Sequence, residues 1–216
     1  MPGLIRNSGW PSTLELGLRL ALGVGLAIGL YQWHGRDLAE ISLPLVRWAI
    51  EGLDDHYRVL VLAVSKEGAD TVFVLRANLA RPLVMGGQVL MPHPLGWAQI
   101  TTPVGNMLQS VVIMIGLLPV WPVKQRREWL WRLMAAIVLL PALLLTIPFT
   151  LWAFLWELSV QAFAPDRFSP LLVWLHFMEG GGRIILGWAA CGVACWVARG
   201  FCGQECFPFR VKGLFQ

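Results

Sequence analysis

The sequence predicts a membrane α-helical protein, with about four transmembrane helices and a small extracytoplasmic α+β insertion between the first and the second. Three observations lead to this fold class. Of the 216 residues, 56% are hydrophobic and only 14% are charged, whereas roughly a quarter of a soluble domain is charged. Twelve Trp stand against two Tyr, and Trp favours the membrane–water interface. Long apolar runs also flank a short basic turn.

Residues 1–34 are predicted to form a cytoplasmic N-terminus and the first transmembrane helix. The apolar run Leu14–Trp33 has the length of about 20 residues that a helix needs to cross a bilayer. Ser12 and Glu15 form a capping-box pattern at its start. A cleaved signal peptide is the alternative. The length of the run and its interruption by Arg19 favour an uncleaved anchor.

Residues 35–104 are predicted to form the extracytoplasmic insertion, an amphipathic helix followed by a β-hairpin. Apolar residues at roughly helical spacing in Arg36–Gly52 are typical of a helix on a membrane surface. Tyr57–Val64 and Thr71–Leu75 are rich in β-branched residues and flank a polar turn. A further extended piece is expected at Gln88–Met91, and Gly86-Gly87 is interpreted as part of a loop. So small a unit is expected to share its core with the membrane helices.

Residues 105–158 are predicted to cross the membrane twice, as a helical hairpin with a basic turn. This turn holds Lys124, Arg126, Arg127 and Arg132 against the single acid Glu128. Because Lys and Arg concentrate in short cytoplasmic loops, the four basic residues are predicted to set the topology and to place the turn in the cytoplasm.

Residues 159–199 are predicted to form an outer loop and the fourth transmembrane helix, which starts near Gly180 and ends at Arg199. Residues 200–216 are predicted to be a cytoplasmic tail. Four crossings put both termini on the side of the basic turn, which predicts a multi-pass membrane protein whose N- and C-termini are both cytoplasmic. The formal charge of +4 lies beside apolar runs, where topology explains it. The lipid bilayer is therefore the expected partner of the basic residues, and no nucleic acid is expected.

The cysteines allow several interpretations. Their spacing puts Cys191, Cys195, Cys202 and Cys206 near one face of a helix. A metal site and palmitoylation of Cys202 or Cys206 are two interpretations. Cysteines without a chemical role are favoured, because zinc sites prefer tighter pairs on turns. Asp54-Asp55-His56 offers metal ligands as well, but turn polarity explains it more simply. No metal and no cofactor are expected.

The most informative polar cluster precedes the last apolar run, and it comprises His176, Glu179, Gly181, Gly182 and Arg183. Ionisable residues at the end of a span usually face protein or a water-filled pocket, and the glycines let the backbone approach a ligand closely. The functional interpretation is a docking or substrate site at the outer membrane surface. The structural alternative is a kinked helix in which Arg183 snorkels and pairs with Glu179.

The layout resembles that of the small membrane proteins that accompany exosortase H in bacterial protein sorting. The resemblance rests on one span followed by an outer domain of strands and a spanning hairpin. It also rests on the entry Pro103–Leu108 and on the stretch His176–Arg183. It implies a non-enzymatic accessory protein that works beside a membrane partner, a sorting protease or export component.

Two other functions stay open at this point. One is a membrane cysteine protease or transpeptidase that uses Cys191 or Cys195 with His176 and Arg183. In the exosortases themselves, however, the Cys precedes the Arg and the His, and here it follows them. The other is a small transporter subunit, which the scarcity of polar residues within the hairpin helices disfavours.

Overall fold

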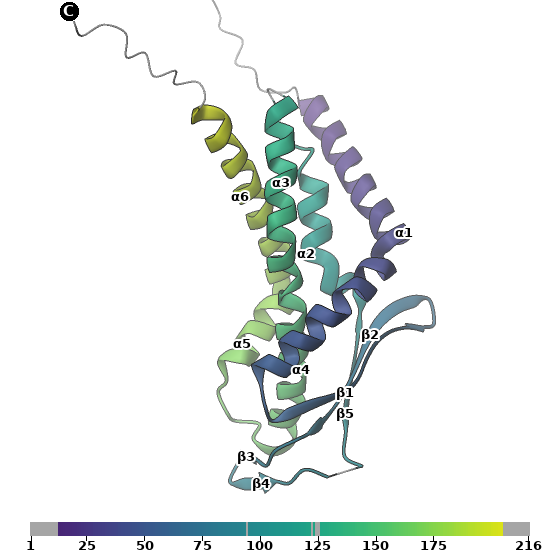
Figure 1. Cartoon of the computed structure of the whole chain (residues 1–216), viewed down its shortest axis with the longest axis vertical. Helices are drawn as coiled ribbons and strands as arrows, with labels where there is room; N and C mark the ends of the chain where they lie inside the picture. The colour runs from purple at the N-terminus through teal and green to yellow at the C-terminus, as the bar shows by residue number, and fades with distance from the viewer. Residues whose placement is uncertain (1–12, 94, 122, 124–125, 205–216) are drawn as a thin grey trace, which may run out of the picture.

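A computed structural model describes residues 13–93, 95–121, 123 and 126–204. The described chain is mostly helical and carries its strands after the first helix, as the sequence predicts (Figure 1). We call the end where α1 begins and α6 finishes the helical end, and the opposite end, with the strands, the strand end. The helices are α1 Thr13–Leu53, α2 Val104–Leu117, α3 Arg126–Leu144, α4 Thr146–Phe163, α5 Pro170–Phe177 and α6 Arg183–Gln204.

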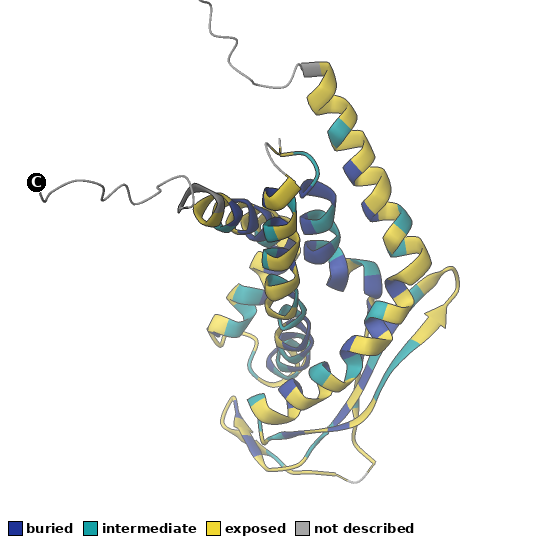
Figure 2. Cartoon of the chain, turned by 45° about the horizontal axis from the view of Figure 1, so that its top comes forward, coloured by how far each residue is buried: buried dark blue, intermediate teal, exposed yellow. Residues whose placement is uncertain are grey.

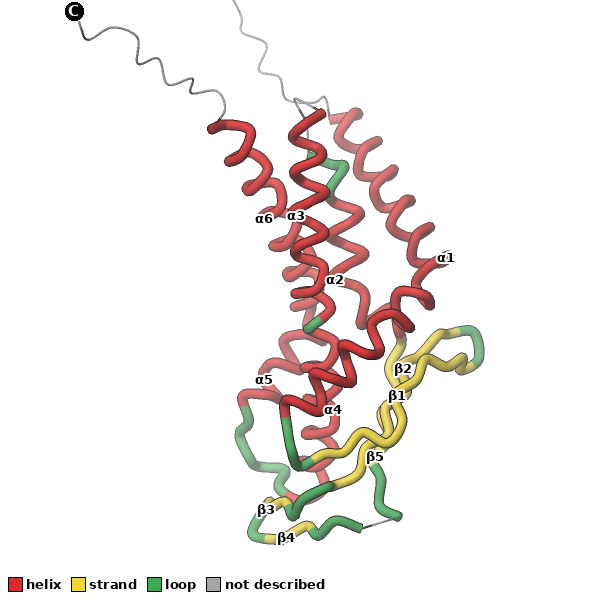
Figure 3. The backbone as a smooth tube through the Cα atoms, in the orientation of Figure 1, coloured by secondary structure: helices red, strands yellow, loops and turns green. Residues whose placement is uncertain are grey.

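Helix α1 joins the predicted first span and the predicted amphipathic helix into one helix of 41 residues, which Figure 3 shows bending on its way to the strands. Gly35, at the junction of the two predicted segments, packs beside the ring of Tyr31. Ion pairs of Arg36 with Glu40 and of Arg47 with Glu51 support the second half, because residues four apart are neighbours on a helix. At about 1.5 Å per residue the helix is about 62 Å long, twice the bilayer core.

The two halves of α1 differ in burial. Figure 2 shows the first half as mostly exposed, although its sequence is apolar. In the second half, Ala39, Val46 and Ile50 are buried in a core that also includes residues of the strands and of α4. The helical spacing that predicted a membrane-surface helix therefore reflects, on its buried side, packing against protein.

The insertion contains a sheet of three strands, in the order β1-β2-β5. Strand β1, Tyr57–Glu67, and strand β2, Asp70–Leu79, form an antiparallel hairpin whose turn contains Gly68 at φ 62°. Strand β5, Ala98–Pro103, pairs with the other edge of β2, with Phe73 opposite Thr102. Because α2 begins at Val104, directly after β5, the sheet connects to this helix without a loop.

A second hairpin lies where the sequence indicated a loop and one extended piece. Strands β3, Leu83–Met85, and β4, Gln88–Leu90, pair antiparallel across Gly86 and Gly87. Both glycines have positive φ, 60° and 78°, which a two-residue hairpin turn requires and which glycine adopts without steric cost. A Cβ on Gly86 would come within 2.0 Å of the carbonyl oxygen of Phe163, so this turn packs directly on the end of α4.

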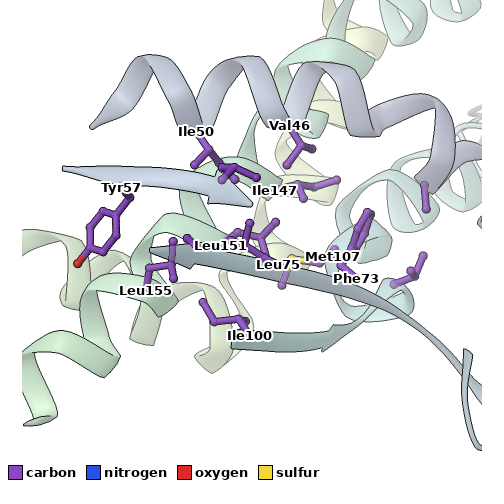
Figure 4. Close-up of a cluster of buried hydrophobic side chains, with 14 of the residues drawn as sticks. Val46, Ile50, Tyr57, Phe73, Leu75, Ile100, Met107, Ile147, Leu151 and Leu155 are labelled. Carbon is purple, nitrogen blue, oxygen red and sulfur yellow. The ribbon is translucent and has the colours of Figure 1, made fainter. Parts of the chain in front are cut away.

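The predicted second half of the helical hairpin is two helices, not one. Helix α3 ends at Leu144, near Pro141, and α4 begins at Thr146, whose hydroxyl donates to the carbonyl of Leu143 at 2.6 Å. Helix α4 then runs beside the sheet to the strand end (Figure 1). Its apolar side chains Ile147, Leu151 and Leu155 fill the core between strands and α1 (Figure 4).

Three helical stretches in the described chain are long and apolar enough to cross a membrane: Leu14–Leu53, Arg126–Phe163 and Pro170–Phe201. The second of them combines α3 and α4. Helix α2, with 14 residues, is shorter, so length and composition identify three spans where the sequence predicted about four. The last of these stretches includes α5 from Pro170 onward. A kink at 178–182, where Gly181 has a non-helical φ of 111°, separates α5 from α6. Helix α6 begins at Arg183, close to the start near Gly180 that the sequence predicts for the last span.

Helices α1 and α2 approach closely at Gly23. A Cβ there would lie 2.1 Å from the carbonyl oxygen of Gly116, and small residues permit such close contact between membrane helices. We expect Gly23→Ala to lower the free energy of unfolding by about 1–3 kcal/mol, since the helices must separate. Gly25→Ala is the matched control, because nothing lies within 4 Å of a Cβ at Gly25. Thermal unfolding in detergent measures both, and equal shifts would contradict the prediction.

Candidate functional site

A polar pocket of about 420 Å³ lies where the sheet meets the helices. The end of β5, the first turns of α2, the middle of α4 and the bend between α5 and α6 form its walls. Its polar lining is Thr102, Asn106, Gln109, Glu179 and Arg183, and its apolar lining is Pro103, Phe154 and Met178.

The structure brings two of the five predicted contact residues to this pocket, Glu179 and Arg183. Gly181 supplies the positive φ that bends the helix between them. Gly182 is buried, and a Cβ there would lie 2.5 Å from the ring of Phe177. His176 is exposed and does not line the pocket. The cluster is therefore divided into pocket residues, residues that shape the bend, and one surface residue.

Arg183 is the distinctive side chain of the pocket. The residue is only 7% exposed, so it does not snorkel. Glu179 acts on it electrostatically, but the two form no ion pair. Within the part of the chain that the structure describes, Arg183 makes neither a hydrogen bond nor an ion pair. A buried charge without a partner is costly, so the surroundings of Arg183 favour an anionic group.

The first turn of α2 adds to the positive potential in the pocket. Its N-cap residue is Pro103, which makes no side-chain capping bond. The first N–H groups of a helix have no partner within the helix, and they carry the positive end of its dipole. Sequence reasoning identified the entry Pro103–Leu108 only as a resemblance. Its contribution to a pocket with Arg183, about 80 residues later, depends on tertiary structure.

The basic turn lies at the opposite, helical end, and its residues are placed differently. Arg126 and Arg127 are exposed, and Lys124 is outside the described residues. Arg132 is fully buried, pairs with Glu128 and donates to the carbonyl oxygen of Trp121 at 2.9 Å. Arg132 is thus held inside the bundle, unlike the exposed pair. A further cation approaches from α6, since Arg199 Nε lies 3.9 Å from Glu128 Oε1.

The cysteines do not join the predicted contact residues. Cys191 and Cys195 are buried in α6, in a cluster with residues of α2 and α3. Cys191 lies eight residues beyond Arg183, about 12 Å along the helix at 1.5 Å per residue. The side chain of Cys202 and the whole of Cys206 lie outside the described residues. Among the described residues, no group of three His, Cys, Asp or Glu could hold a metal ion.

Asp54-Asp55-His56 is structured as a turn between α1 and β1. Asp54 accepts hydrogen bonds from the backbone N–H of His56 at 2.9 Å and from Trp152 Nε1 at 3.2 Å, and its Oδ1 lies 2.6 Å from His56 Nδ1. Asp55 pairs with Arg81 at 3.0 Å. The two carboxylates therefore engage different partners, as the simpler interpretation of turn polarity predicts.

Asp54 and His56 also border a second cavity, which is larger than the Arg183 pocket. This cavity, of about 670 Å³, is lined mainly by apolar and aromatic side chains of α4 and α5, with Trp152, Trp156 and Trp174 among them. Next to it, the hydroxyls of Tyr57 and Ser159 hydrogen-bond at 2.9 Å and join β1 to α4. Burial raises the pKa of Tyr57, the charge of Asp54 raises it further, and the hydrogen bond with Ser159 opposes the rise.

Fold and pocket together define a helical membrane protein with a strand-containing domain inserted after its first helix and a polar pocket with a buried arginine where domain and helices meet. Comparisons of the chain with protein-family models, with curated proteins and with solved structures found no match.

Proposed function

We propose that this chain is a non-enzymatic accessory protein of the bacterial inner membrane, which binds a membrane-protein partner through its extracytoplasmic end in a sorting or export system of exosortase type. The observation that carries the proposal is a patch of exposed apolar side chains at the strand end. The resemblance in layout described above supports the choice of system.

The apolar patch belongs to the β3–β4 hairpin and the segment after it. Each of its side chains is more than half exposed: Val84, Val89, Met91, Leu95 and Trp97. Gathered apolar surface marks an interaction site on proteins, and aromatic residues and Met are enriched where partners bind. The guanidinium of Arg76 lies over the ring of Trp97, 5.0 Å from its centroid, which leaves this part of the patch amphipathic.

A lipid bilayer is too thin to cover this patch together with the helical end. Helix α3, with 19 residues, is about 28 Å long and already matches a bilayer core of about 30 Å. Helix α4, with 18 residues, adds about 27 Å toward the strand end. The β3–β4 turn packs on the far end of α4, at Phe163. A protein partner is therefore the occupant we propose.

The proposed membrane arrangement has four crossings, by the first half of α1, by α2, by α3 and by α6. The start of α1, the connection from α2 to α3 and the end of α6 lie at the same end of the molecule (Figure 1). Exposed Arg126, Arg127 and Arg199 are found there, which supports a cytoplasmic location for both termini. Helix α2, about 21 Å long at 1.5 Å per residue, spans by local thinning of the bilayer.

In this arrangement the Arg183 pocket lies at the outer surface of the membrane. We include exposed Glu179, which lines the pocket, and exposed His176 of α5 in the surface that contacts the partner or the substrate of that partner. Gly181 and Gly182 shape this region through the helix bend. The contact surface thus runs from the membrane level to the strand end.

The proposal is tested by recovering the tagged protein in mild detergent, at native expression in its source bacterium, and identifying what accompanies it by mass spectrometry. We expect a larger membrane protein of the sorting or export class. Met91→Asp combined with Leu95→Asp is expected to lower its recovery about tenfold, because burying the charges in an interface opposes binding. The variant leaves the strands themselves intact, since both residues follow β4.

Leu60→Asp serves as the control, because Leu60 is exposed on β1 and not in the patch. It should leave the recovery unchanged. Isolation of the wild-type protein alone would contradict the proposal, and so would unchanged recovery of the partner with the patch variant.

A further inference from the structure

We infer that the Arg183 pocket is a binding site for a phosphate group, which the headgroup of an anionic phospholipid or a free phosphate supplies. The inference rests on the proposed function for the position of the pocket at the outer membrane surface. It goes beyond that function in naming what the pocket holds. Four features of the site carry it.

First, the pocket holds a cation without an anion. Arg183 is more than nine-tenths buried and lines the pocket, and the described residues offer it no hydrogen bond and no ion pair. A guanidinium presents its N–H groups in a planar fork that matches the oxygens of a phosphate. A bound phosphate would supply the partner that the chain itself does not.

Second, the uncharged polar side chains of the lining can all donate hydrogen bonds. The amides of Asn106 and Gln109 and the hydroxyl of Thr102 face the same space, and each of these groups can donate to a phosphate oxygen. They come from the start of α2 and the end of β5, so the fold gathers donors from two elements around one guanidinium.

Third, the first turn of α2 presents N–H groups that no side chain caps. Helix N-termini with free N–H groups bind phosphates through these donors and through the helix dipole. The dipole and Arg183 act in the same direction, because both favour negative charge.

Fourth, the size and position of the pocket suit a headgroup. A volume of about 420 Å³ exceeds the roughly 30 Å³ share of one water molecule by an order of magnitude. Arg183 is the first residue of α6, and exposed apolar residues such as Ile184, Ile185 and Trp188 follow it directly. Acyl chains would contact these side chains while the phosphate sits beside Arg183.

The carboxylate of Glu179 opposes the binding of an anion in the pocket, so its removal provides a specific test of the inference. Its exposed carboxylate lines the same pocket and reduces the positive potential that a phosphate would meet. Glu179→Gln should therefore strengthen binding about threefold, whereas Arg183→Gln should weaken it at least about tenfold. Arg183→Gln removes a buried charge without a partner, so the ligand-free variant should fold at least as well as the wild type.

The experiment uses the full chain in a neutral detergent and has two arms. The first measures by native mass spectrometry how much phosphatidylglycerol is retained against phosphatidylcholine. The second measures the rise in unfolding temperature with inorganic phosphate. Arg58→Gln is the matched control, since it removes an exposed arginine from β1.

Each outcome decides the inference. Selective retention of phosphatidylglycerol that Arg183→Gln abolishes and Glu179→Gln increases supports a lipid headgroup. The same pattern with inorganic phosphate alone supports a free phosphate. The inference is overturned if neither probe binds, or if the Arg183 and Arg58 variants bind the probes equally. These measurements need no partner protein, so phosphate binding can be found even if the recovery experiment fails. A partner can likewise be recovered even if no phosphate binds.

Discussion

Glu128→Leu is expected to lower the free energy of unfolding by about 3–5 kcal/mol, because it leaves the fully buried guanidinium of Arg132 without its carboxylate. The hydrogen bond from Arg132 to the carbonyl oxygen of Trp121 remains in this variant. Arg199 loses a nearby anion as well, but its side chain is 57% exposed and water can solvate it. Unfolding in detergent micelles by added SDS measures the change.

The double variant Glu128→Leu with Arg132→Met separates the pair from the packing around it. Replacing both members of a buried ion pair with apolar residues is often nearly neutral. We expect the free energy of unfolding of the double variant to lie within about 1 kcal/mol of the wild-type value. Arg126→Gln is the control for charge at the same end, because Arg126 is exposed. If the double variant is as unstable as Glu128→Leu, loss of the ion pair is not the cause.

The basic turn also shows which features of the structure can be predicted from the sequence and which cannot. Counting Lys and Arg treats Arg126 and Arg132 alike, yet the first is exposed and the second is fully buried. One signal could have separated them, since Glu128 and Arg132 are four residues apart and share a helix face. The approach of Arg199 from α6 has no such signal, because it depends on the contact between two helices distant in sequence.

The strands were predictable where the local pattern was strong. Two runs rich in β-branched residues around a polar turn with Gly68 indicate the β1–β2 hairpin. The Gly86-Gly87 dipeptide between short extended segments is likewise a hairpin signal, and it was interpreted as a loop because three-residue strands carry little pattern. The pairing of β5 with β2 closes a loop of about 20 residues, and no local rule specifies such a pairing.

The candidate site was predictable only in part. The sequence directed attention to Glu179 and Arg183, since ionisable residues beside an apolar run are unusual. It did not reveal Thr102, Asn106 and Gln109, which are ordinary polar residues until the fold places them around Arg183. The sequence also did not distinguish a buried arginine from a snorkelling one, because in both cases an arginine stands at the end of an apolar helix.

Helix α4 provides the most instructive difference, because its apolar sequence looked like a continuation of the membrane span. Composition does not tell a lipid-facing side chain from one in a protein core. The structure separates them: Leu151 of α4 is fully buried against the strands, whereas Leu130 of α3 is 61% exposed. If α4 belongs to the core of the strand-containing domain, the same substitution should have a large effect on stability at Leu151 and a small one at Leu130.

Leu151→Ala is therefore expected to lower the free energy of unfolding by about 2–5 kcal/mol, through lost burial and the cavity left among Phe73, Leu75 and Ile147. Leu130→Ala should change it by less than about 0.5 kcal/mol, since an exposed position leaves no cavity. Unfolding by SDS in micelles compares the two directly. Equal losses of stability would mean that α4 packs as α3 does. The core of the strand-containing domain would then have to be formed by other residues. A larger loss for Leu151→Ala than for Leu130→Ala would assign the apolar residues of α4 to protein packing. The sequence of this helix would then resemble a membrane span because its side chains fill the core beside the sheet.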